Sequence, residues 1–530
     1  MGALGAAGVA LAPMLSKAQE NPKICKPNLV VILVDDMGYS DAGFMGGEIK
    51  TPNLDRLARE GIVMTRAVNC AVCSPTRTSL LTGTYSHKAG YPRLAGRLDP
   101  EFPMLPEMLA DAGYSSYMSG KWHLKPQKPE ERGFERFFGF LHGCTTHWDD
   151  VWARSRHSRP RPESGLVYSS DAIADNAIAF LKENEKTNRP FFLYYSFTAP
   201  HYPIHAPREL IDLYESQYRA GWDGVRQTRW ERQQRIGFWP ATAQLPDDRT
   251  IGPRFQEAEW ANQPVPAWDS LPPDRRADLT RRMAVHAAMV DQIDVNIGRL
   301  LDYLRASGQL DNTVIFFASD NGCSAQGGAF GGTYKSGRKP NRPLTGPELE
   351  KLGGPDSNET LGAGWARASN APLRYSKAHA HAGGNVTPLL IWGRLVRERA
   401  GQYDATPCHV IDIAPTCLGL AAGEPPSTGF DGVSLDPVFR NESLPERTLF
   451  FELSGEKAIV TPSWRAVKTG RATWELYDEK ADPTETTDLA GGHPDAVKDL
   501  AAAHAAWMKS MAVRTPSVEK PQESQPEEQE

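Results

Sequence analysis

The chain has 530 residues, of which 40% are hydrophobic and 23% charged, a composition typical of a folded globular protein and not of a disordered one. Its length is too great for one small domain and is ample for a large core. With a net charge of −6 it offers no global reason to bind nucleic acid. No stretch is long and apolar enough to form a transmembrane helix, so no integral membrane span is expected.

The first residues are typical of a targeting segment. Residues 2–15 are small and apolar, and Ser16-Lys17-Ala18 follows as a small-x-small cleavage site. The pattern is similar to a secretory signal that lacks its basic start. We therefore expect residues 1–23 to be a signal-like leader and the protein to be exported, to a periplasm or out of the cell. A short disordered leader is the alternative.

Short apolar runs are typical of buried parallel strands, and polar clusters follow them. The runs cover residues 28–34, 114–119, 191–197, 313–319 and 388–392. Helical patterns lie between them, at about 51–61, 171–184 and 281–307. This alternation predicts an α/β sheet covered by helices on both faces. Because ligands bind beyond the carboxyl ends of such strands, we expect the polar clusters to form one site.

The remaining segments are less regular. Residues 215–275 read as a long excursion over the surface, and residues 331–368 as a loop. From about residue 441, short strand-like segments and a helix near 493–511 predict a smaller α+β subdomain at 441–512, after a main domain at 24–440. The tail, 513–530, lacks apolar residues and is predicted to be disordered.

Cys73-Ser74-Pro75-Thr76-Arg77 is the most informative segment. Ser74 is a good N-cap and Pro75 suits the first helical turn, so a helix is expected to start here and to end at Gly83. Cys73 would lie at the positive end of that helix, a position that favours a tetrahedral anion. The guanidinium of Arg77 could bind an oxyanion at the same end.

Other interpretations of Cys73 are open. Cys70 and Cys73 could form a redox pair or half of a zinc site, or Cys73 could simply be buried. No second Cys-x-x-Cys is present. Seven cysteines are an odd number, and their pairing cannot be read from the sequence.

Two pairs of oxygen donors follow strands that are far apart in the chain. They are Asp35-Asp36 and Asp320-Asn321. Oxygen ligands of this kind suit a hard cation, Ca²⁺ or Mg²⁺. Two lysines and two histidines are expected at the same edge of the sheet: Lys121, His123, His201 and Lys377. Together they would supply fixed positive charge, an acid and a base for chemistry on an oxyanion.

These segments resemble the type I sulfatases, in the arylsulfatase-like branch of the alkaline phosphatase superfamily. The resemblance covers about residues 26–511. It rests on residues 28–38, 70–83, 120–123, 199–203, 319–322 and 374–384, and on the closing run 474–485.

The resemblance implies a mixed, mostly parallel sheet between helices, and a catalytic domain at 24–440. It implies that a maturation enzyme, a transient partner that acts on the unfolded chain, oxidises Cys73 to formylglycine. The hydrated aldehyde is a diol. One Ca²⁺ ion would be bound by that diol and by Asp35, Asp36, Asp320 and Asn321.

The implied reaction is hydrolysis of an aryl or carbohydrate sulfate ester to an alcohol and inorganic sulfate. The diol attacks sulfur and later expels sulfate. Arg77 would steady the diol, and Lys121 and Lys377 would hold the sulfate oxygens. His123 would assist the diol, and His201 would protonate the leaving oxygen.

The chain departs from the family at two positions. Ala382 stands where Glu or Gln commonly precedes the glycine pair, and Lys125 stands where glycine is common. These two departures leave the substrate preference and the local loop shape undetermined. Trp148, Tyr202, His205 and the 331–368 loop are candidates to line the pocket.

Two other functions remain as alternatives. The first is a phosphonate or phosphodiester hydrolase of the same superfamily, which can share the modified cysteine and the metal. The second is a non-catalytic protein that binds sulfated glycans, with Cys73 unconverted.

Overall fold

The structure is a computed structural model. It describes residues 26–94, 96–100, 102–148, 153–154, 167–247, 249–251, 264–333, 342–424 and 429–512. The predicted leader and the predicted disordered tail lie outside the described residues, as does part of the predicted 331–368 loop.

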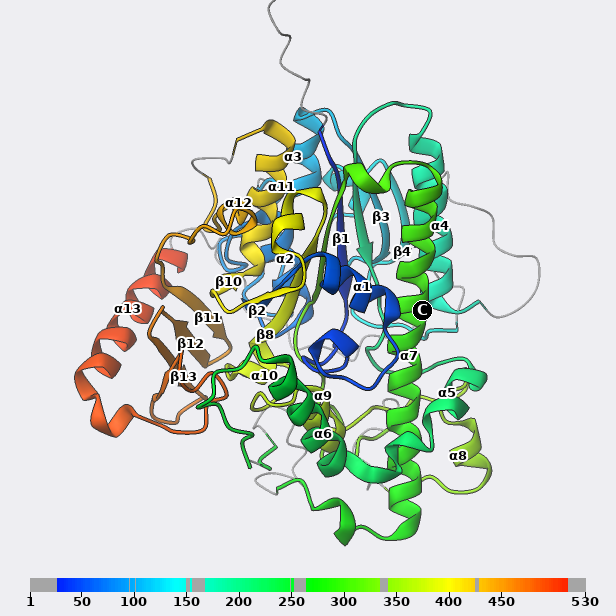
Figure 1. The fold of residues 1–530 in the computed structure, drawn as a ribbon, viewed down its shortest axis with the longest axis vertical. Coiled ribbons are helices and arrows are strands. Elements are labelled where there is room, and N and C mark those ends of the chain that lie inside the picture. The colour runs from blue at the N-terminus through cyan, green and yellow to red at the C-terminus, as the bar shows by residue number, and fades with distance from the viewer. Residues whose placement is uncertain are drawn as a thin grey trace, which may run out of the picture.

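A large mixed sheet lies at the centre of the molecule (Figure 1). Among the described residues it has ten strands, in the order β10-β2-β8-β7-β1-β6-β3-β4-β5, with β9 beside β2. Most neighbouring pairs are parallel, as predicted. The strands are β1 (Asn28–Val34), β2 (Ile62–Val68), β3 (Ser115–Lys121), β4 (Arg136–Phe140), β5 (Ala153–Arg154), β6 (Phe191–Ser196), β7 (Thr313–Ser319), β8 (Val386–Trp392), β9 (Gln402–Asp404) and β10 (Cys408–His409).

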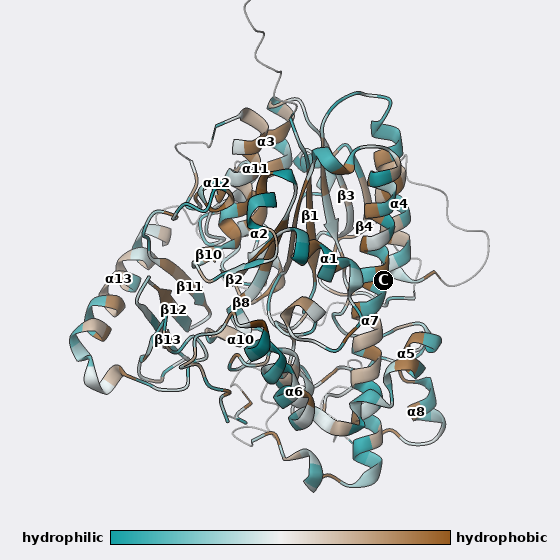
Figure 2. Cartoon of the chain, viewed as in Figure 1, coloured by the Kyte–Doolittle hydropathy of each residue, from teal (hydrophilic) through white to brown (hydrophobic). Residues whose placement is uncertain are grey.

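Helices cover both faces of this sheet, and the strand side chains alternate between the two layers. Val30 and Ile32 of β1 pack with α1 (Pro52–Glu60), α4 (Ser169–Asn184) and α7 (Pro273–Ala306). Val31 and Leu33 pack on the other face with α2 (Cys73–Thr82), α3 (Leu105–Asp111) and α11 (Ile413–Ala422). Figure 2 shows the hydrophobic colouring concentrated on the central strands. The predicted fold class is confirmed.

The prediction that β8 is a parallel strand is wrong. It runs antiparallel to both of its neighbours, β2 and β7. The chain enters β8 from the loop that carries Lys377, at the edge where the parallel strands end. The start of β8 therefore faces the same edge as the ends of β1, β3 and β7, and Lys377 reaches the site without a crossover.

Strand β2 was not predicted. Thr65 and Arg66 interrupt its apolar run, although every residue of the strand is buried. The Arg66 guanidinium donates to the backbone carbonyl of Glu479, in the C-terminal part of the chain. A buried arginine that is satisfied by a distant carbonyl has no local sequence signal.

The prediction that residues 215–275 form a surface excursion is wrong for the part that forms α6 (Gly221–Ile236). Trp222, Arg229 and Gln233 of this helix are buried. Arg229 pairs with the carboxylates of Asp41 and Glu48 at 2.7 Å each. The buried face of α6 is polar, so the apolar periodicity that marks most helices is missing.

Two further predictions differ from the structure. Helix α7 begins at Pro273, eight residues before the expected start, because Arg275 and Asp278 in its first turns are buried as an ion pair. The predicted loop at 331–368 contains α8 (Pro347–Lys351) and α9 (Ala363–Ser369). The remaining helices are α5 (Arg208–Tyr214), α10 (Ala382–Asn385), α12 (Asp436–Phe439) and α13 (Pro494–Ala512).

The C-terminal part forms a second, antiparallel sheet. Its strands are β11 (Leu449–Leu453), β12 (Glu456–Val460), β13 (Trp464–Lys468) and β14 (Glu475–Asp478), with α13 packed beside them (Figure 1). Phe451 and Val467 share a buried cluster with Ala71 and Val72. The second sheet therefore supports the segment that leads into Cys73. The boundary at residue 441 stays a prediction.

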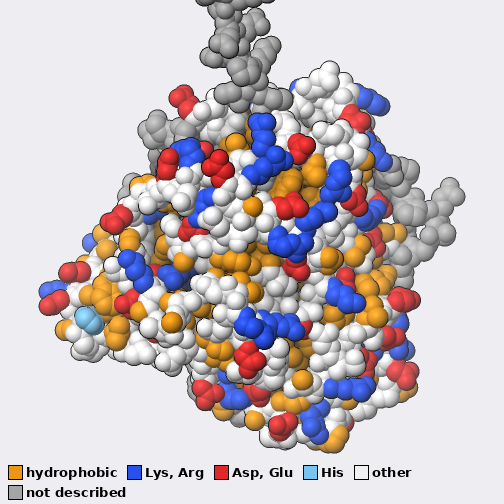
Figure 3. Space-filling model, viewed as in Figure 1, with side chains coloured by type: hydrophobic (Ala, Val, Ile, Leu, Met, Phe, Trp, Pro, Cys, Tyr) orange, Lys and Arg blue, Asp and Glu red, His pale blue; other side chains and the backbone are white. Residues whose placement is uncertain are grey.

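No helix in the described part of the chain is long and apolar enough to cross a membrane. On the face shown in Figure 3, acidic and basic side chains are interspersed among apolar ones.

Candidate active site

The polar clusters predicted at strand ends lie at one edge of the sheet. Asp35 and Asp36 follow β1, Asp320 and Asn321 follow β7, and Lys121 is the last residue of β3. Neighbouring strands β1 and β7 are in register from Asn28 and Thr313 to Val34 and Ser319, so the two acidic pairs emerge side by side. All five side chains are buried.

Cys73 is the first residue of α2, at the same edge. The N-cap is Val72, so the expectation that Ser74 caps the helix is wrong by two residues. The Cys73 Sγ lies 3.3 Å from Asp35 Oδ1 and 3.2 Å from Lys377 Nζ. Residue 73 is therefore held between a carboxylate and an ammonium group, at the positive end of a buried helix.

Arg77, one turn into α2, is fully buried and links three strands to the helix. Its guanidinium donates to Asp320 Oδ2 at 2.8 Å, to Ser196 Oγ at 2.6 Å and to the Lys121 carbonyl at 3.0 Å. Ser196, at the end of β6, was not predicted as part of the site. Ser196 could have been found by the criterion that identified the other site residues, because it is a polar side chain at the end of a strand.

A lysine neutralises each of the first two carboxylates. Lys121 Nζ donates to Asp35 Oδ2, and Lys377 Nζ donates to Asp36 Oδ1 at 2.6 Å. Burial opposes the charge on both lysines, but the adjacent carboxylates outweigh it and raise the pKa of both ammonium groups. Both lysines are therefore cationic at neutral pH.

Three buried carboxylates, those of Asp35, Asp36 and Asp320, lie close together in this cluster. Burial, together with the negative charge of Asp35, raises the pKa of Asp320 to about 7. Burial would also raise the pKa of Asp35, but Lys121 and the other cations hold it well below its usual range. The carboxylates repel one another, and a cation among them would relieve that repulsion.

Two oxygen atoms at this position lack partners. Asp36 Oδ2 and Asn321 Oδ1 are buried, and no residue that the structure describes donates a hydrogen bond to them. Ligand atoms of Asp35, Asp36, Cys73 and His201 lie within 4.8 Å of one another. A buried acceptor without a donor is costly, so these atoms fit a hard cation such as Ca²⁺.

The two histidines, His123 and His201, differ in their hydrogen bonds. His201 Nδ1 is 2.6 Å from the Tyr202 carbonyl, which leaves Nε2 facing Asp36 Oδ2 at 3.6 Å. Burial lowers the pKa of His201 to about 4. Burial and the charge of Lys121 lower the pKa of His123, whose Nδ1 has no hydrogen-bond partner among the described residues.

Backbone strain is concentrated here. Nine non-glycine residues of the described chain have a positive φ, and five of them flank the site: Asp36, Ala71, His123, Tyr375 and Ala378. Such conformations persist only where the surrounding structure enforces them. The segments that carry the polar side chains are therefore held in fixed, strained positions.

The glycine pair before β8 has a steric reason. A Cβ on Gly322 would lie 1.8 Å from the Gly383 carbonyl oxygen, and a Cβ on Gly383 would lie 2.3 Å from that of Arg374. The Asp320-Asn321-Gly322 segment and the loop that carries Lys377 can meet only as bare backbone. Ala382, the departure beside this pair, begins α10, and its N–H donates to Glu485 of the C-terminal closing run.

The predicted pocket residues divide into two groups. Tyr202 stacks on His201, with ring centroids 4.1 Å apart, and is the one that adjoins the cluster. His205 is buried, with Nε2 2.6 Å from the Ser357 carbonyl, and Trp148 packs on Tyr168. These two support the surrounding loops.

The surroundings of Cys73 disfavour the redox interpretation, and the group of possible metal ligands around Cys73 does not include Cys70. Burial and the nearby carboxylates of Asp320 and Asp35 raise the pKa of the Cys73 thiol, whereas a reactive thiolate needs a lowered pKa. Cys70 and Cys73 are both free thiols and form no disulfide with each other.

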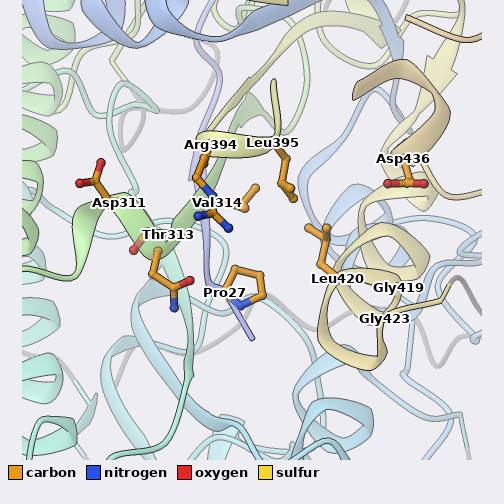
Figure 4. Close-up of a pocket in the computed structure, with 11 residues that line it drawn as sticks. Pro27, Asp311, Thr313, Val314, Arg394, Leu395, Gly419, Leu420, Gly423 and Asp436 are labelled. Carbon is orange, nitrogen blue, oxygen red and sulfur yellow. The ribbon is translucent and has the colours of Figure 1, made fainter. Parts of the chain in front are cut away.

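A cavity lies at the opposite edge of the sheet (Figure 4). It has a volume of about 200 Å³ and is lined by Pro27, which precedes β1, and Thr313, which begins β7. Because these are the amino ends of the strands, this cavity is separate from the polar cluster.

Comparisons with known proteins identify the family. The sulfatase family model matches residues 27–424. An uncharacterized sulfatase of Schizosaccharomyces pombe is 34% identical, over 90% of this chain and 92% of its own length. An arylsulfatase of Klebsiella aerogenes is 32% identical, over 78% of this chain and 92% of its own.

Solved structures share the fold. One, described as bound to its substrate D-glucosamine-2-N,6-O-disulfate, has a TM-score of 0.62 at 22% identity and covers 93% of this chain and 99% of its own. Another, described as a complex with a neocarrahexaose, has a TM-score of 0.64 at 22% identity, over 91% of this chain and 93% of its own. The chain belongs to the sulfatase family, the hydrolases of sulfate esters.

Proposed function

We propose that the cluster around Cys73 is the active site, that it hydrolyses aryl or carbohydrate sulfate esters, and that it does so with a formylglycine at position 73 and one Ca²⁺ ion. The observation that carries this proposal is the position of the Cys73 Sγ, between Asp35 and Lys377 at the end of a buried helix. Formylglycine would supply a hydrated aldehyde, whose hydroxyl groups attack sulfur and then release sulfate.

The cation would be held by Asp35, Asp36, Asp320 and Asn321. The support for this is the pair of buried acceptors without donors and the mutual repulsion of the carboxylates. A bound Ca²⁺ ion supplies positive charge that stabilises the transferring sulfate group. With those carboxylates engaged, Lys121 and Lys377 would be free to donate to the sulfate oxygens.

The proton transfers would belong to the two histidines. Nδ1 of His201 is committed to the Tyr202 carbonyl, so Nε2 is the atom that faces the site and would give a proton to the leaving oxygen. A bound sulfate ester brings negative charge and thereby raises the pKa of this buried imidazole. His123 has a free, buried Nδ1 that would take a proton from residue 73.

Arg77 would hold the catalytic edge together and would not touch the substrate. It is fully buried, and its hydrogen bonds go to Asp320, Ser196 and the Lys121 backbone. It therefore fixes the position of a cation ligand and of a sulfate-binding lysine at once.

The proposed substrate class follows from the relatives. A relative from Bacteroides thetaiotaomicron, 28% identical over 92% of this chain, is an N-acetylglucosamine-6-O-sulfatase, and the Klebsiella relative is an arylsulfatase. We infer that this protein acts on one of these classes, sulfated sugars or aryl sulfates. We also infer that it is exported, from residues 2–18, and that a formylglycine-generating enzyme acts on the chain before it folds, because Cys73 is buried.

The first test is sulfate release by protein co-expressed with a formylglycine-generating enzyme, with Cys73→Ala as the variant. We expect turnover of aryl or sugar sulfates that disappears in Cys73→Ala, because alanine cannot be converted to an aldehyde. Cys70→Ala, which alters the neighbouring thiol, is the matched control and should keep turnover. Wild-type turnover in Cys73→Ala would refute the proposal, and cleavage of a phosphodiester in place of the sulfate ester would support the alternative hydrolase.

Removal of the cation is the second test. Dialysis against a chelator should abolish turnover and lower the apparent Tm, because the buried carboxylates then repel one another. Added Ca²⁺ should restore both in the wild type but not in Asp320→Ala. A chelated protein with unchanged Tm and turnover would contradict the proposed metal site.

A further inference from the structure

A second cluster of cationic side chains lies beside the loop that carries Lys377. Three arginines line one small cavity there: Arg226 of α6, Arg367 of α9 and Arg374 of the following loop. Tyr375 and Ser376, the residues immediately before Lys377, line the same cavity. Figure 1 shows α6, α9 and α10 grouped below the sheet edge that carries the active site.

Arg226 is the unusual member of this group. It is only 5% exposed, and its Nε is buried without a hydrogen-bond partner. No hydrogen bond or ion pair links its guanidinium to any residue that the structure describes. A buried arginine without a partner is rare, because the loss of hydration is not offset.

The other charged groups around the cavity have partners. Asp223 is shared between Arg249 at 2.9 Å and Arg367 at 3.4 Å. Arg374 donates to the Tyr477 hydroxyl at 2.7 Å and pairs with Glu475 at 3.3 Å. The carboxylates of Asp223 and Asp247 act on Arg226 only at longer range. Arg226 therefore differs from Arg367 and Arg374, which have carboxylate or hydroxyl partners of their own.

The electrostatic surroundings of Arg226 also favour a bound anion. Burial and the charge of Arg367 lower the pKa of its guanidinium to about 9. An anion bound to Arg226 would offset both the cost of burying the guanidinium and its repulsion by Arg367.

We propose that this cavity binds a small oxyanion, a carboxylate or a sulfate group, through the guanidinium of Arg226. Arginine offers paired N–H donors that match two oxygens of such a group. The volume, about 30 Å³, accommodates one small group and excludes a sugar ring.

Two sources could supply the oxyanion. It could be free in solution, including the sulfate that the reaction releases. It could also be an acidic substituent carried by a neighbouring sugar of the substrate, since Ser376 of the cavity is followed directly by Lys377 of the active site. The second source rests on the proposed function, whereas the site itself does not.

The binding test uses sodium formate, the smallest carboxylate, at constant ionic strength maintained with chloride. Formate should raise the apparent Tm of the wild type by several degrees, and this rise should disappear in Arg226→Gln. Arg235→Gln, which removes an exposed arginine from the same helix, should respond as the wild type does. Crystals grown with formate should show it against Arg226. An equal Tm response in Arg226→Gln and wild type, or a cavity without formate, would overturn the proposal.

The stability of the variant is an independent readout. Arg226→Gln should have a higher apparent Tm than the wild type when no formate is present, because it removes an unpaired buried charge. A lower Tm would mean that Arg226 is already satisfied within the fold, and would count against the site.

The kinetic test separates the two sources. The substrates are 4-nitrophenyl sulfate, a sulfated disaccharide with a neighbouring uronic acid, and its carboxyl-reduced counterpart. If the substrate supplies the oxyanion, Arg226→Gln should raise KM about tenfold or more for the uronic acid substrate alone. Unchanged KM for all three, with formate binding intact in the wild type, assigns the site to a free anion. A wild type that hydrolyses none of them refutes the proposed function and leaves the formate result standing.

Discussion

His201 shows how a single residue's surroundings decide its chemistry. The Tyr202 carbonyl takes one ring nitrogen, Asp36 faces the other, and the Tyr202 ring covers the imidazole. Orientation and tautomer are thus set before any substrate binds. Without substrate, burial lowers the pKa to about 4, so the ring is neutral at pH 7. The proposed acid therefore depends on the negative charge of the bound ester for its proton.

Replacement of His201 tests this role. We expect His201→Gln to lower kcat/KM by a factor of about 10² to 10⁴ for substrates with a poor leaving group, such as a sugar alcohol, because these need a proton from the enzyme. The loss should be much smaller for 4-nitrophenyl sulfate, because its leaving group, 4-nitrophenolate, is a stable anion that needs no proton. A series of aryl sulfates with graded leaving-group pKa values measures the difference. An equal loss for all substrates would assign His201 to binding and not to proton transfer.

At the scale of elements, buried polar faces join the helices to the sheet edge that carries the polar cluster. Asp41, in the loop that follows β1, pairs with Arg229 of α6 at 2.7 Å and contacts Nε2 of His286, in α7, at 2.9 Å. Burial would raise the pKa of Asp41, but His286 and Arg229 lower it to about 2. This contact also holds the backbone of Gly38, two residues after Asp36.

The Asp41 contact gives a prediction with a pH dependence. Asp41→Asn should destabilise the protein by about 3–5 kcal/mol at pH 7, since it leaves Arg229 less than fully paired. The pKa of Asp41 in the folded protein lies below its ordinary value of 3.8. The stabilisation is therefore present above about pH 4 and is lost as the pH falls towards 2.

Thermal unfolding of the wild type and of Asp41→Asn between pH 7 and pH 2.5 measures this pH-dependent stabilisation. The difference in apparent Tm should be constant above about pH 5 and should shrink below pH 4. Asp302→Asn removes an exposed partner of Arg305 on α7 and should change stability by less than about 1 kcal/mol. A Tm difference for Asp41→Asn that does not change with pH would show that the carboxylate charge is not what stabilises this contact.

At the scale of the whole molecule, the C-terminal sheet supports the proposed active site. Its strands share a buried cluster with Ala71, Val72 and Ala378, which flank Cys73 and Lys377. Arg465 of β13 reaches Asn385 at 2.6 Å and Glu485 at 2.6 Å, and so connects this sheet to α10. Residues more than 300 positions apart thus hold Cys73 and Lys377 in place.

Truncation of a side chain in this buried cluster tests whether the C-terminal sheet holds Cys73 and Lys377 in place. Phe451→Ala should lower the free energy of unfolding by about 3–5 kcal/mol, because it leaves a cavity under the Cys73 segment. Turnover should fall on heating before the main sheet unfolds, as measured by parallel activity and circular dichroism scans. Lys457→Ala, at a partly exposed position on β12, is the control and should change neither. Coincident losses in Phe451→Ala would show that the two sheets unfold as one unit.

Much of the fold could be predicted because the runs of β1, β6 and β7 are continuously apolar and bounded by polar residues, and the structure has them within one residue of the predicted limits. The predictions failed where the buried face is polar. Strand β2 contains Arg66, α6 contains Arg229 and α7 contains Arg282. Each of these buried arginines has a partner far away in the chain: the Glu479 carbonyl, Asp41 and Glu359. Such pairs leave no periodic signal.

The sequence by itself determined the family, the α/β class, and the set of residues that collect at one edge of the sheet, because side chains at the ends of parallel strands must meet there. Tertiary structure alone decided the direction of β8, which brings Lys377 to that edge, and the contacts of Cys73 with Asp35 and Lys377. It alone showed the unpaired Arg226. These features depend on which distant segments pack together, and local sequence carries no record of that packing.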